Sequence, residues 1–123
     1  MATTEREFTL AEARALLPEV LAKADEIVRL RADLAELALE LNTEGSSTFG
    51  GIPEAKAYEA RLEEHLAWFG EQGIEVKGLA PLLIDFPARI DGRSVRLCWL
   101  EGDRELAWYH LSELGFIGRR PLS

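Results

Sequence analysis

The feature that most constrains the fold is a long helical stripe of apolar residues near the start of the chain. Apolar residues follow one another at alternating steps of three and four over residues 10–41, with Arg31 as the single interruption. This spacing predicts one long helix with a heptad seam. Thr9 and Glu12 fit a capping box at its start. Pro18 lies two turns inside, so we expect it to kink the helix or to divide it into a short and a long piece.

The length of this helix bears on the oligomeric state. Residues 10–41 span about 48 Å at about 1.5 Å per residue. A compact domain of 123 residues has a diameter of only about 35 Å. Part of the stripe is then uncovered within one subunit, and we predict a homodimer through the long N-terminal helix. The alternative is that a kink at Pro18 folds the helix back within one subunit.

The rest of the chain predicts an α+β fold in a single domain, residues 1–123. Residues 42–53 are rich in Gly, Ser and Thr, which indicates a flexible loop between two helices. Residues 8–73 then form a helical hairpin. Residues 74–123 are rich in Val, Ile, Trp, Pro and Gly, which favours an antiparallel meander of three to four strands followed by a C-terminal tail.

The strongest turn signal in this second part is Asp91-Gly92, which predicts a two-residue hairpin turn. The turn pairs Ile90 with Arg93, and side chains on either side then alternate between the two faces of the sheet. We expect the helices to cover the apolar face, which the pattern assigns to Ile84, Phe86, Ala88, Val95, Leu97 and Trp99.

A second turn is expected at residues 101–104, and its length decides which way the last strand faces. An even-length loop places Trp99 opposite Leu106 and Leu97 opposite Trp108, so that the apolar face continues onto the last strand. An odd-length loop would set Trp99 against a glutamate, and we therefore reject it.

The opposite face carries a mixed charged and aromatic strip. The predicted register aligns Asp85 with Cys98 and Arg96 with Tyr109, and we expect Asp85 to form a salt bridge with Arg96 or Arg89. Such a strip is either a solvated sheet surface or a surface that faces a ligand. The candidate binding residues are therefore Asp85, Arg89, Arg96, Cys98 and Tyr109.

Asp85, Cys98 and His110 are the candidates for metal binding or nucleophilic chemistry. The sequence holds no closely spaced ligand pair such as Cys-x-x-Cys or His-x-x-x-His. The predicted register also places His110 across from Val95 on the apolar face, whereas Cys98 and Asp85 face the other way. Since these groups cannot then share one ion or form a Cys–His pair, we expect no metal site and no cofactor.

Short motifs follow one another through the second half of the chain: Asp85-Phe86-Pro87, Asp91-Gly92-Arg93, Leu97-Cys98-Trp99, Gly102-Asp103, His110, Gly115-Phe116 and Gly118-Arg119. This ordered set resembles a prokaryotic family catalogued only as a domain of unknown function, whose members read roughly DFP, DGR, LCW, GE, WH, GF and GR. The chain departs from that pattern at Asp103, where the family has glutamate, and at Tyr109, where it has tryptophan. The resemblance implies no particular activity, but it implies a set of motif positions: Asp85, Arg93, Cys98, Trp99, His110 and Arg119.

Composition narrows the classes of partner. A net charge of −8 argues against the cationic surface that a nucleic-acid-binding protein needs, and the longest apolar run, residues 79–84, is too short to cross a membrane. One cysteine and no signal pattern at the start favour the cytoplasm. We therefore predict a small, soluble, non-enzymatic homodimer of unknown function that binds another protein or a small molecule. The alternative is an enzyme or a metal-dependent binder that uses Asp85, Cys98, His110 and Arg96.

Overall fold

The computed structural model describes residues 6–122, and its helices precede its strands as predicted. The expectation of a cytoplasmic location depended partly on residues 1–5, which lie outside this range. The order of elements is α1 (Leu10–Glu44), α2 (Ile52–Glu71), β1 (Glu75–Leu79), β2 (Leu82–Ile90), β3 (Arg93–Leu100), β4 (Trp108–Leu111), the short 3₁₀ helix η1 (Phe116–Gly118) and β5 (Arg120–Pro121). The strands form one antiparallel sheet in sequence order. The α+β class is confirmed, with β5 as a short strand beyond the expected three to four.

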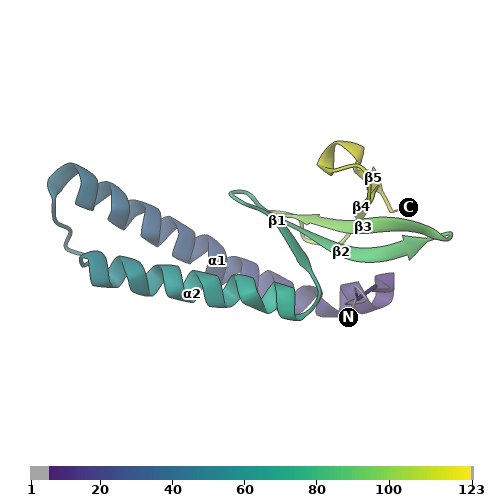
Figure 1. Cartoon of the computed structure of the whole chain (residues 1–123), viewed down its shortest axis with the longest axis horizontal. Helices are drawn as coiled ribbons and strands as arrows, with labels where there is room; N and C mark the ends of the chain where they lie inside the picture. The colour runs from purple at the N-terminus through teal and green to yellow at the C-terminus, as the bar shows by residue number, and fades with distance from the viewer. Residues whose placement is uncertain (1–5, 123) are drawn as a thin grey trace, which may run out of the picture.

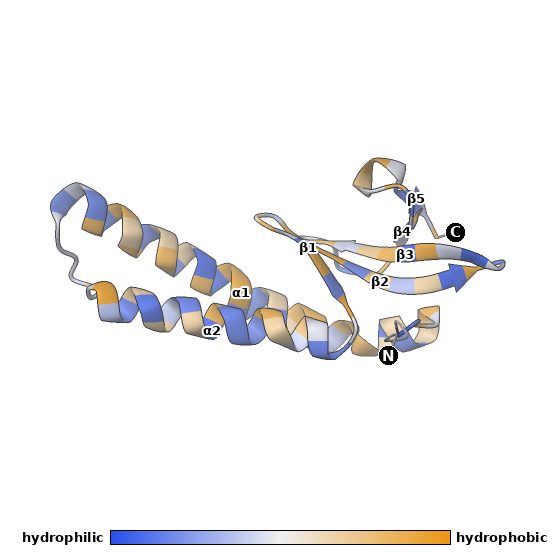
Figure 2. Ribbon diagram, in the orientation of Figure 1, coloured by the Kyte–Doolittle hydropathy of each residue, from blue (hydrophilic) through white to orange (hydrophobic). Residues whose placement is uncertain are grey.

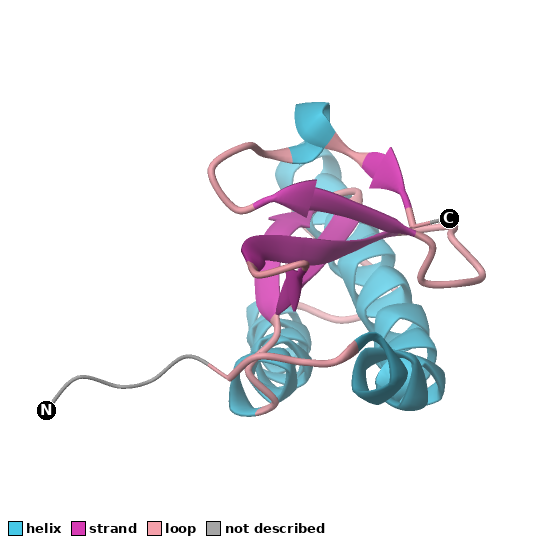
Figure 3. Cartoon of the chain, turned by 90° about the vertical axis from the view of Figure 1, so that its right-hand side faces the viewer, coloured by secondary structure: helices cyan, strands magenta, loops and turns pink. Residues whose placement is uncertain are grey.

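The helical hairpin and the sheet overlap over only part of their lengths. One end of the hairpin lies against the sheet, and the other end extends well beyond it (Figure 1). Viewed along the long axis, the sheet lies between the start of α1 and the η1 turn (Figure 3). Elements therefore pack on both faces of the sheet, and the outer face is not simply exposed to solvent.

The first helix begins where the capping box predicts. The Glu12 amide donates to Thr9 Oγ1 at 3.0 Å, and the Thr9 amide donates to Glu12 Oε1 at 2.9 Å. The helix continues through Pro18 without a break, so the expected division into two helices is not observed. It ends at Gly45, whose φ of 75° is the left-handed conformation that glycine adopts at low cost.

The first β-hairpin forms with the predicted register. Asp91 and Gly92 both have positive φ, as a tight two-residue turn requires. Strands β2 and β3 pair Phe86 with Leu97 and carry the same face through the neighbouring pairs. This face packs against α1, α2 and Phe8 to form the core, whose largest fully buried side chains are Trp99, Phe69, Phe86, Ile27, Leu82, Ile84, Leu97 and Leu106.

Strand β4 lies one residue out of the predicted register. The structure pairs Leu97 with Tyr109 rather than with Trp108, and it pairs Cys98 with Trp108. Because side chains alternate along a strand with a period of two, this difference turns all of β4 over. The prediction for the second turn is therefore wrong.

The physical reason lies in the loop formed by residues 101–107. The Asp103 carboxylate accepts a hydrogen bond from the Leu100 amide at 3.0 Å, and the Asp103 carbonyl accepts one from the Trp99 indole at 3.0 Å. The chain therefore curls around Asp103 instead of continuing the ladder. Leu106 is buried as the apolar pattern predicts, but it is buried from the loop and pairs with no strand.

Arg31, the interruption in the apolar stripe, ties α1 to the sheet. Its guanidinium binds the two carboxylate oxygens of Glu101 at 2.7 and 3.0 Å and donates to the Leu79 carbonyl at 2.6 Å. Glu101 Oε1 also accepts from the Leu82 amide at 2.8 Å. Beyond this contact, Leu37 is the one further buried residue within α1. Arg31 therefore marks the place where the hairpin leaves the sheet.

We expect the Arg31–Glu101 pair to stabilise the fold in a pH-dependent way. Hydrogen bonds from Arg31 and from the Leu82 amide lower the pKa of Glu101. A carboxyl group with a lowered folded-state pKa stabilises the folded chain above its unfolded pKa of about 4.3, and this is lost as the pH falls through the folded-state value. Glu101→Gln should lower the free energy of unfolding by about 1 kcal/mol at neutral pH, with the difference disappearing in acid.

Urea denaturation at several pH values measures this effect. Asp25→Asn is the matched control, because it removes an exposed pair with Arg29 on the same helix and should cost less than about 0.5 kcal/mol. A loss in Glu101→Gln that stays the same from neutral to acid pH would contradict the assignment.

Candidate functional site

The change of register brings three chemically distinct side chains together on the outer face of the sheet. His110 lies opposite Arg96 on β4 and β3, and Asp85 lies opposite Cys98 on β2 and β3. The ligand atoms of Asp85, Cys98 and His110 all lie within 4.8 Å of one another, and all three residues are buried. The expectation that His110 lies across from Val95 on the apolar face is therefore wrong. We call these three residues the Asp85–Cys98–His110 cluster.

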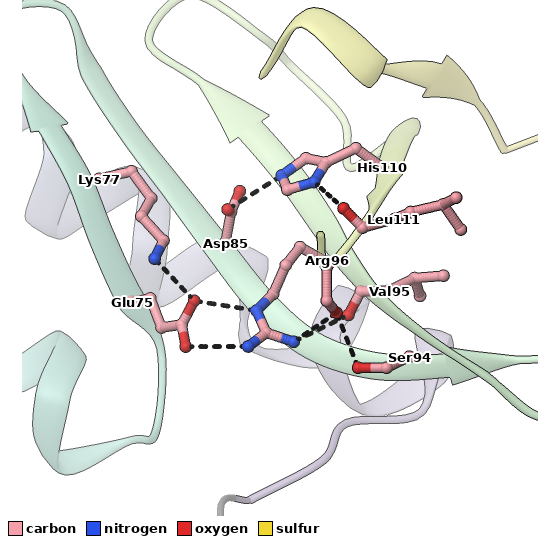
Figure 4. A network of polar contacts seen from close by, with 9 residues as sticks. Glu75, Lys77, Asp85, Ser94, Val95, Arg96, His110 and Leu111 are labelled. Atoms are coloured by element: carbon pink, nitrogen blue, oxygen red, sulfur yellow. Dashed lines mark hydrogen bonds and ion pairs between the residues drawn. The ribbon is translucent and has the colours of Figure 1, made fainter. Parts of the chain in front are cut away.

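Both ring nitrogens of His110 are engaged. Nδ1 lies 2.8 Å from the Leu111 carbonyl, and Nε2 lies 3.0 Å from Asp85 Oδ2 (Figure 4). A carbonyl oxygen can only accept, so Nδ1 carries a hydrogen. The Nε2–Oδ2 contact then needs a proton or a cation between the two atoms. Asp85 thus pairs with His110, whereas Arg89, one of its two expected partners, pairs with Glu7.

The second carboxylate oxygen of Asp85, Oδ1, does not take part in the contact with His110. Asp85 is 2% exposed, and its Oδ1 atom has no hydrogen-bond partner within residues 6–122. Buried carboxylate oxygens are normally hydrogen-bonded because their desolvation is costly. A cavity of about 230 Å³ lies beside this group, lined by Lys77, Leu83, Asp85, Arg96, His110, Ser112, Leu114, Gly115 and Phe116.

The environment of Cys98 does not activate its thiol. Burial, followed by the negative charge of Asp85, raises the pKa of Cys98 to about 12. The thiol is therefore protonated at neutral pH, whereas a catalytic cysteine needs a thiolate or an adjacent base. The two ring nitrogens of His110 contact Asp85 and the Leu111 carbonyl.

Arg96 and Lys77 line the cavity, and Glu75 joins the two through polar contacts (Figure 4). Arg96 Nε lies 2.9 Å from Glu75 Oε1, and Arg96 Nη1 donates to Ser112 Oγ at 2.9 Å. Lys77 Nζ lies 3.2 Å from the same Glu75 oxygen. Burial alone would raise the pKa of Glu75, but the hydrogen bonds from Arg96 and Lys77 outweigh it and hold the pKa below its usual value. This network links β1 to β3 across β2, beside the cluster.

Two predicted site residues lie elsewhere. Arg89 is exposed and pairs with Glu7, with Nε 2.9 Å from Oε2. Tyr109 lies opposite Leu97 on the apolar face and packs against the core. The prediction that Tyr109 shares the outer face with Arg96 is wrong, because it depended on the second turn.

The remaining motif positions have structural surroundings. Arg93 is exposed at the first hairpin turn, and Trp99 is buried with its indole bonded to the Asp103 carbonyl. Arg119 pairs with the Asp103 carboxylate and stacks over the Trp108 ring at 4.7 Å. These contacts connect the loop around Asp103 to the C-terminal segment.

Sequence reasoning missed part of the cavity. Lys77 and its partner Glu75 lie on β1, and nothing in the sequence pattern pointed to the ion pair between Glu75 and Arg96. Ser112, Leu114 and Phe116 come from a segment without regular periodicity, and their place over the outer face follows only from the tertiary fold.

The fold and the cluster define an α+β protein in which a helical hairpin packs on an antiparallel sheet and the far side of the sheet carries a buried carboxylate, thiol and imidazole. The chain belongs to the family described as "Uncharacterized conserved protein (DUF2203)", whose model matches residues 6–122. The resemblance to a family of unknown function is thus confirmed. No curated protein and no solved structure matches the chain. Neither helix of the described chain is long and apolar enough to cross a membrane.

We expect the Cys98 thiol to be nearly inert in the folded chain. A thiol with a pKa of about 12 holds roughly a thousandfold less thiolate at about pH 8 than an unfolded cysteine with a pKa of about 8.5. Iodoacetamide labelling followed by mass spectrometry should therefore be at least about a thousandfold slower in the native protein than in urea. Comparable labelling rates in the two states would show that the thiol is activated.

Proposed function

We propose that this chain is a binding protein whose small ligand occupies the cavity beside Asp85 and His110. The observation that carries the proposal is the buried Asp85 Oδ1 atom, which has no hydrogen-bond partner in the described structure and lies in a residue that lines the cavity. A carboxylate oxygen can only accept hydrogen bonds or bind a cation. The ligand is therefore a cation or a group that donates a hydrogen bond.

The size of the cavity restricts the ligand further. A volume of about 230 Å³ is below the roughly 300–1,000 Å³ of typical pockets for drug-sized ligands. It holds an ion with its waters or a molecule of few heavy atoms. Arg96 and Lys77 in the cavity lining already form ion pairs with Glu75. The lining atom in need of a partner is therefore Asp85 Oδ1.

The chemistry of the cluster supports binding rather than nucleophilic catalysis. The Cys98 thiol is protonated because burial and Asp85 raise its pKa to about 12. The His110 ring has no nitrogen directed to the thiol as a base. A thiol nucleophile activated by a histidine therefore has no counterpart here.

Thermal unfolding with three separate probes tests the proposal: Zn²⁺, Mg²⁺ and guanidinium at millimolar concentration. At least one should raise Tm by about 5–10 °C at a hundredfold excess over its Kd. Asp85→Asn should abolish this rise because it removes the charge, whereas the exposed control Asp25→Asn should retain it. The proposal fails if no probe gives a saturable rise that depends on Asp85.

A second proposal concerns assembly: the chain forms a homodimer through the part of the hairpin that extends beyond the sheet. Apolar residues continue along both helices to the free end (Figure 2). Leu39, Phe49 and Ile52 there are 63%, 63% and 69% exposed. Exposed apolar residues clustered at one end of a protein favour a contact with a second copy.

Light scattering during size-exclusion chromatography tests the dimer. The wild type should have twice the 13.7 kDa chain mass, and the triple variant Leu39→Gln, Phe49→Gln, Ile52→Gln should be monomeric. The matched control is Ile117→Gln, because Ile117 is 96% exposed on η1, far from the free end, and its variant should remain dimeric. A monomeric wild type, or a dimer lost only in Ile117→Gln, would contradict the proposal.

We also propose that the protein works in the cytoplasm. Its single cysteine, Cys98, is a free and buried thiol. An unpaired thiol suits a reducing compartment.

A further inference from the structure

We propose that Asp85, Cys98 and His110 together bind one divalent transition-metal ion, for which zinc is the best match. The inference rests on the proposed function and names the ligand of the same cavity. Three neighbouring strands each contribute one residue, and their ligand atoms already lie within 4.8 Å of one another. Ligand atoms around a tetrahedral zinc are separated by about 3.3–3.7 Å, so movements of about 1 Å complete the site.

The ring of His110 is oriented as in metal-binding histidines. Its Nδ1 hydrogen is donated to the Leu111 carbonyl, which directs the Nε2 lone pair toward Asp85 Oδ2 at 3.0 Å. A histidine that binds a metal through one ring nitrogen usually donates the hydrogen of the other nitrogen to a group such as a backbone carbonyl, which holds the ring in place. A cation between Nε2 and Oδ2 satisfies both acceptors at once.

The Oδ1 atom of Asp85 is an independent indication of a ligand. Oδ1 is buried and has no hydrogen-bond partner in the described part of the chain. A carboxylate that binds the metal through both oxygens removes this deficit. The residue also lines the cavity, from which a water molecule can supply the fourth ligand.

The charges of the cluster select a dication. When the ion binds, the Cys98 thiol releases its proton to solvent and becomes a thiolate. The carboxylate of Asp85 and this thiolate then carry two negative charges, His110 is neutral, and a divalent ion brings the buried site to zero. Thiolate and imidazole are ligands of zinc, cobalt or nickel, whereas calcium and magnesium prefer oxygen.

Cobalt titration of chelator-treated, tag-free protein tests the site without any variant. One Co²⁺ per chain should bind with a near-ultraviolet charge-transfer band from thiolate to cobalt, and Zn²⁺ should displace it with a stoichiometry of one. Absence of this band and of stoichiometric zinc uptake in the wild type overturns the inference.

Variants assign the ligands. Cys98→Ser should abolish the charge-transfer band, and Asp85→Asn or His110→Gln should each weaken zinc binding by about 100-fold, since one of three protein ligands is lost. His65→Gln is the matched control, because His65 is the other histidine of the chain and lies on α2. It should bind cobalt like the wild type.

The outcomes separate this inference from the proposed function. A band that persists in Cys98→Ser, or one that His65→Gln removes, places the metal elsewhere and overturns the inference. Asp85-dependent stabilisation by guanidinium without zinc or cobalt binding overturns the metal site and leaves the binding function standing. Circular dichroism of each variant shows whether a loss of binding reflects a loss of fold.

Discussion

The loop around Asp103 decides how the outer face of the sheet is built. The Asp103 carboxylate accepts from the Leu100 amide, and its own amide donates to the Leu100 carbonyl at 2.8 Å. These bonds end β3 at Leu100 and turn the chain back toward the sheet. The loop between β3 and β4 then contains an odd number of residues. Because strand side chains alternate with a period of two, this places His110 beside Asp85 and Cys98. The cluster and its cavity both depend on this register.

The C-terminal segment then converts an exposed surface into a buried one. Arg119 pairs with Asp103 and stacks over Trp108 at 4.7 Å and over Phe116 at 5.2 Å. This holds η1 over the outer face, where Leu114 and Phe116 line the cavity. Polar groups beneath them lose contact with water, so each must find a partner inside the protein or in a ligand. Burial is what gives the Asp85–Cys98–His110 cluster its chemical significance.

The structure could be predicted from the sequence wherever it depends on contacts between residues close together in the chain. Thr9 and Glu12 satisfy the first amides of α1, and Asp91-Gly92 forms a tight turn with positive φ at both residues, whose twist suits a two-residue hairpin. The second turn could not be predicted in this way. The apolar pattern favoured a ladder that continued to Leu106, and Leu106 is indeed buried, but its burial comes from a curled loop that breaks the alternation.

The sequence by itself determined the α+β class, the helical hairpin, the first β-hairpin with its register and the placement of Asp85 opposite Cys98. These features follow from periodicity and from turn and capping residues that act within a few positions of one another. Only the tertiary structure decided that His110 joins Asp85 and Cys98 and that η1 covers them. The reason is that Asp103 receives hydrogen bonds from its neighbours and from Arg119, sixteen residues further along the chain, and no periodic pattern encodes a contact of that kind.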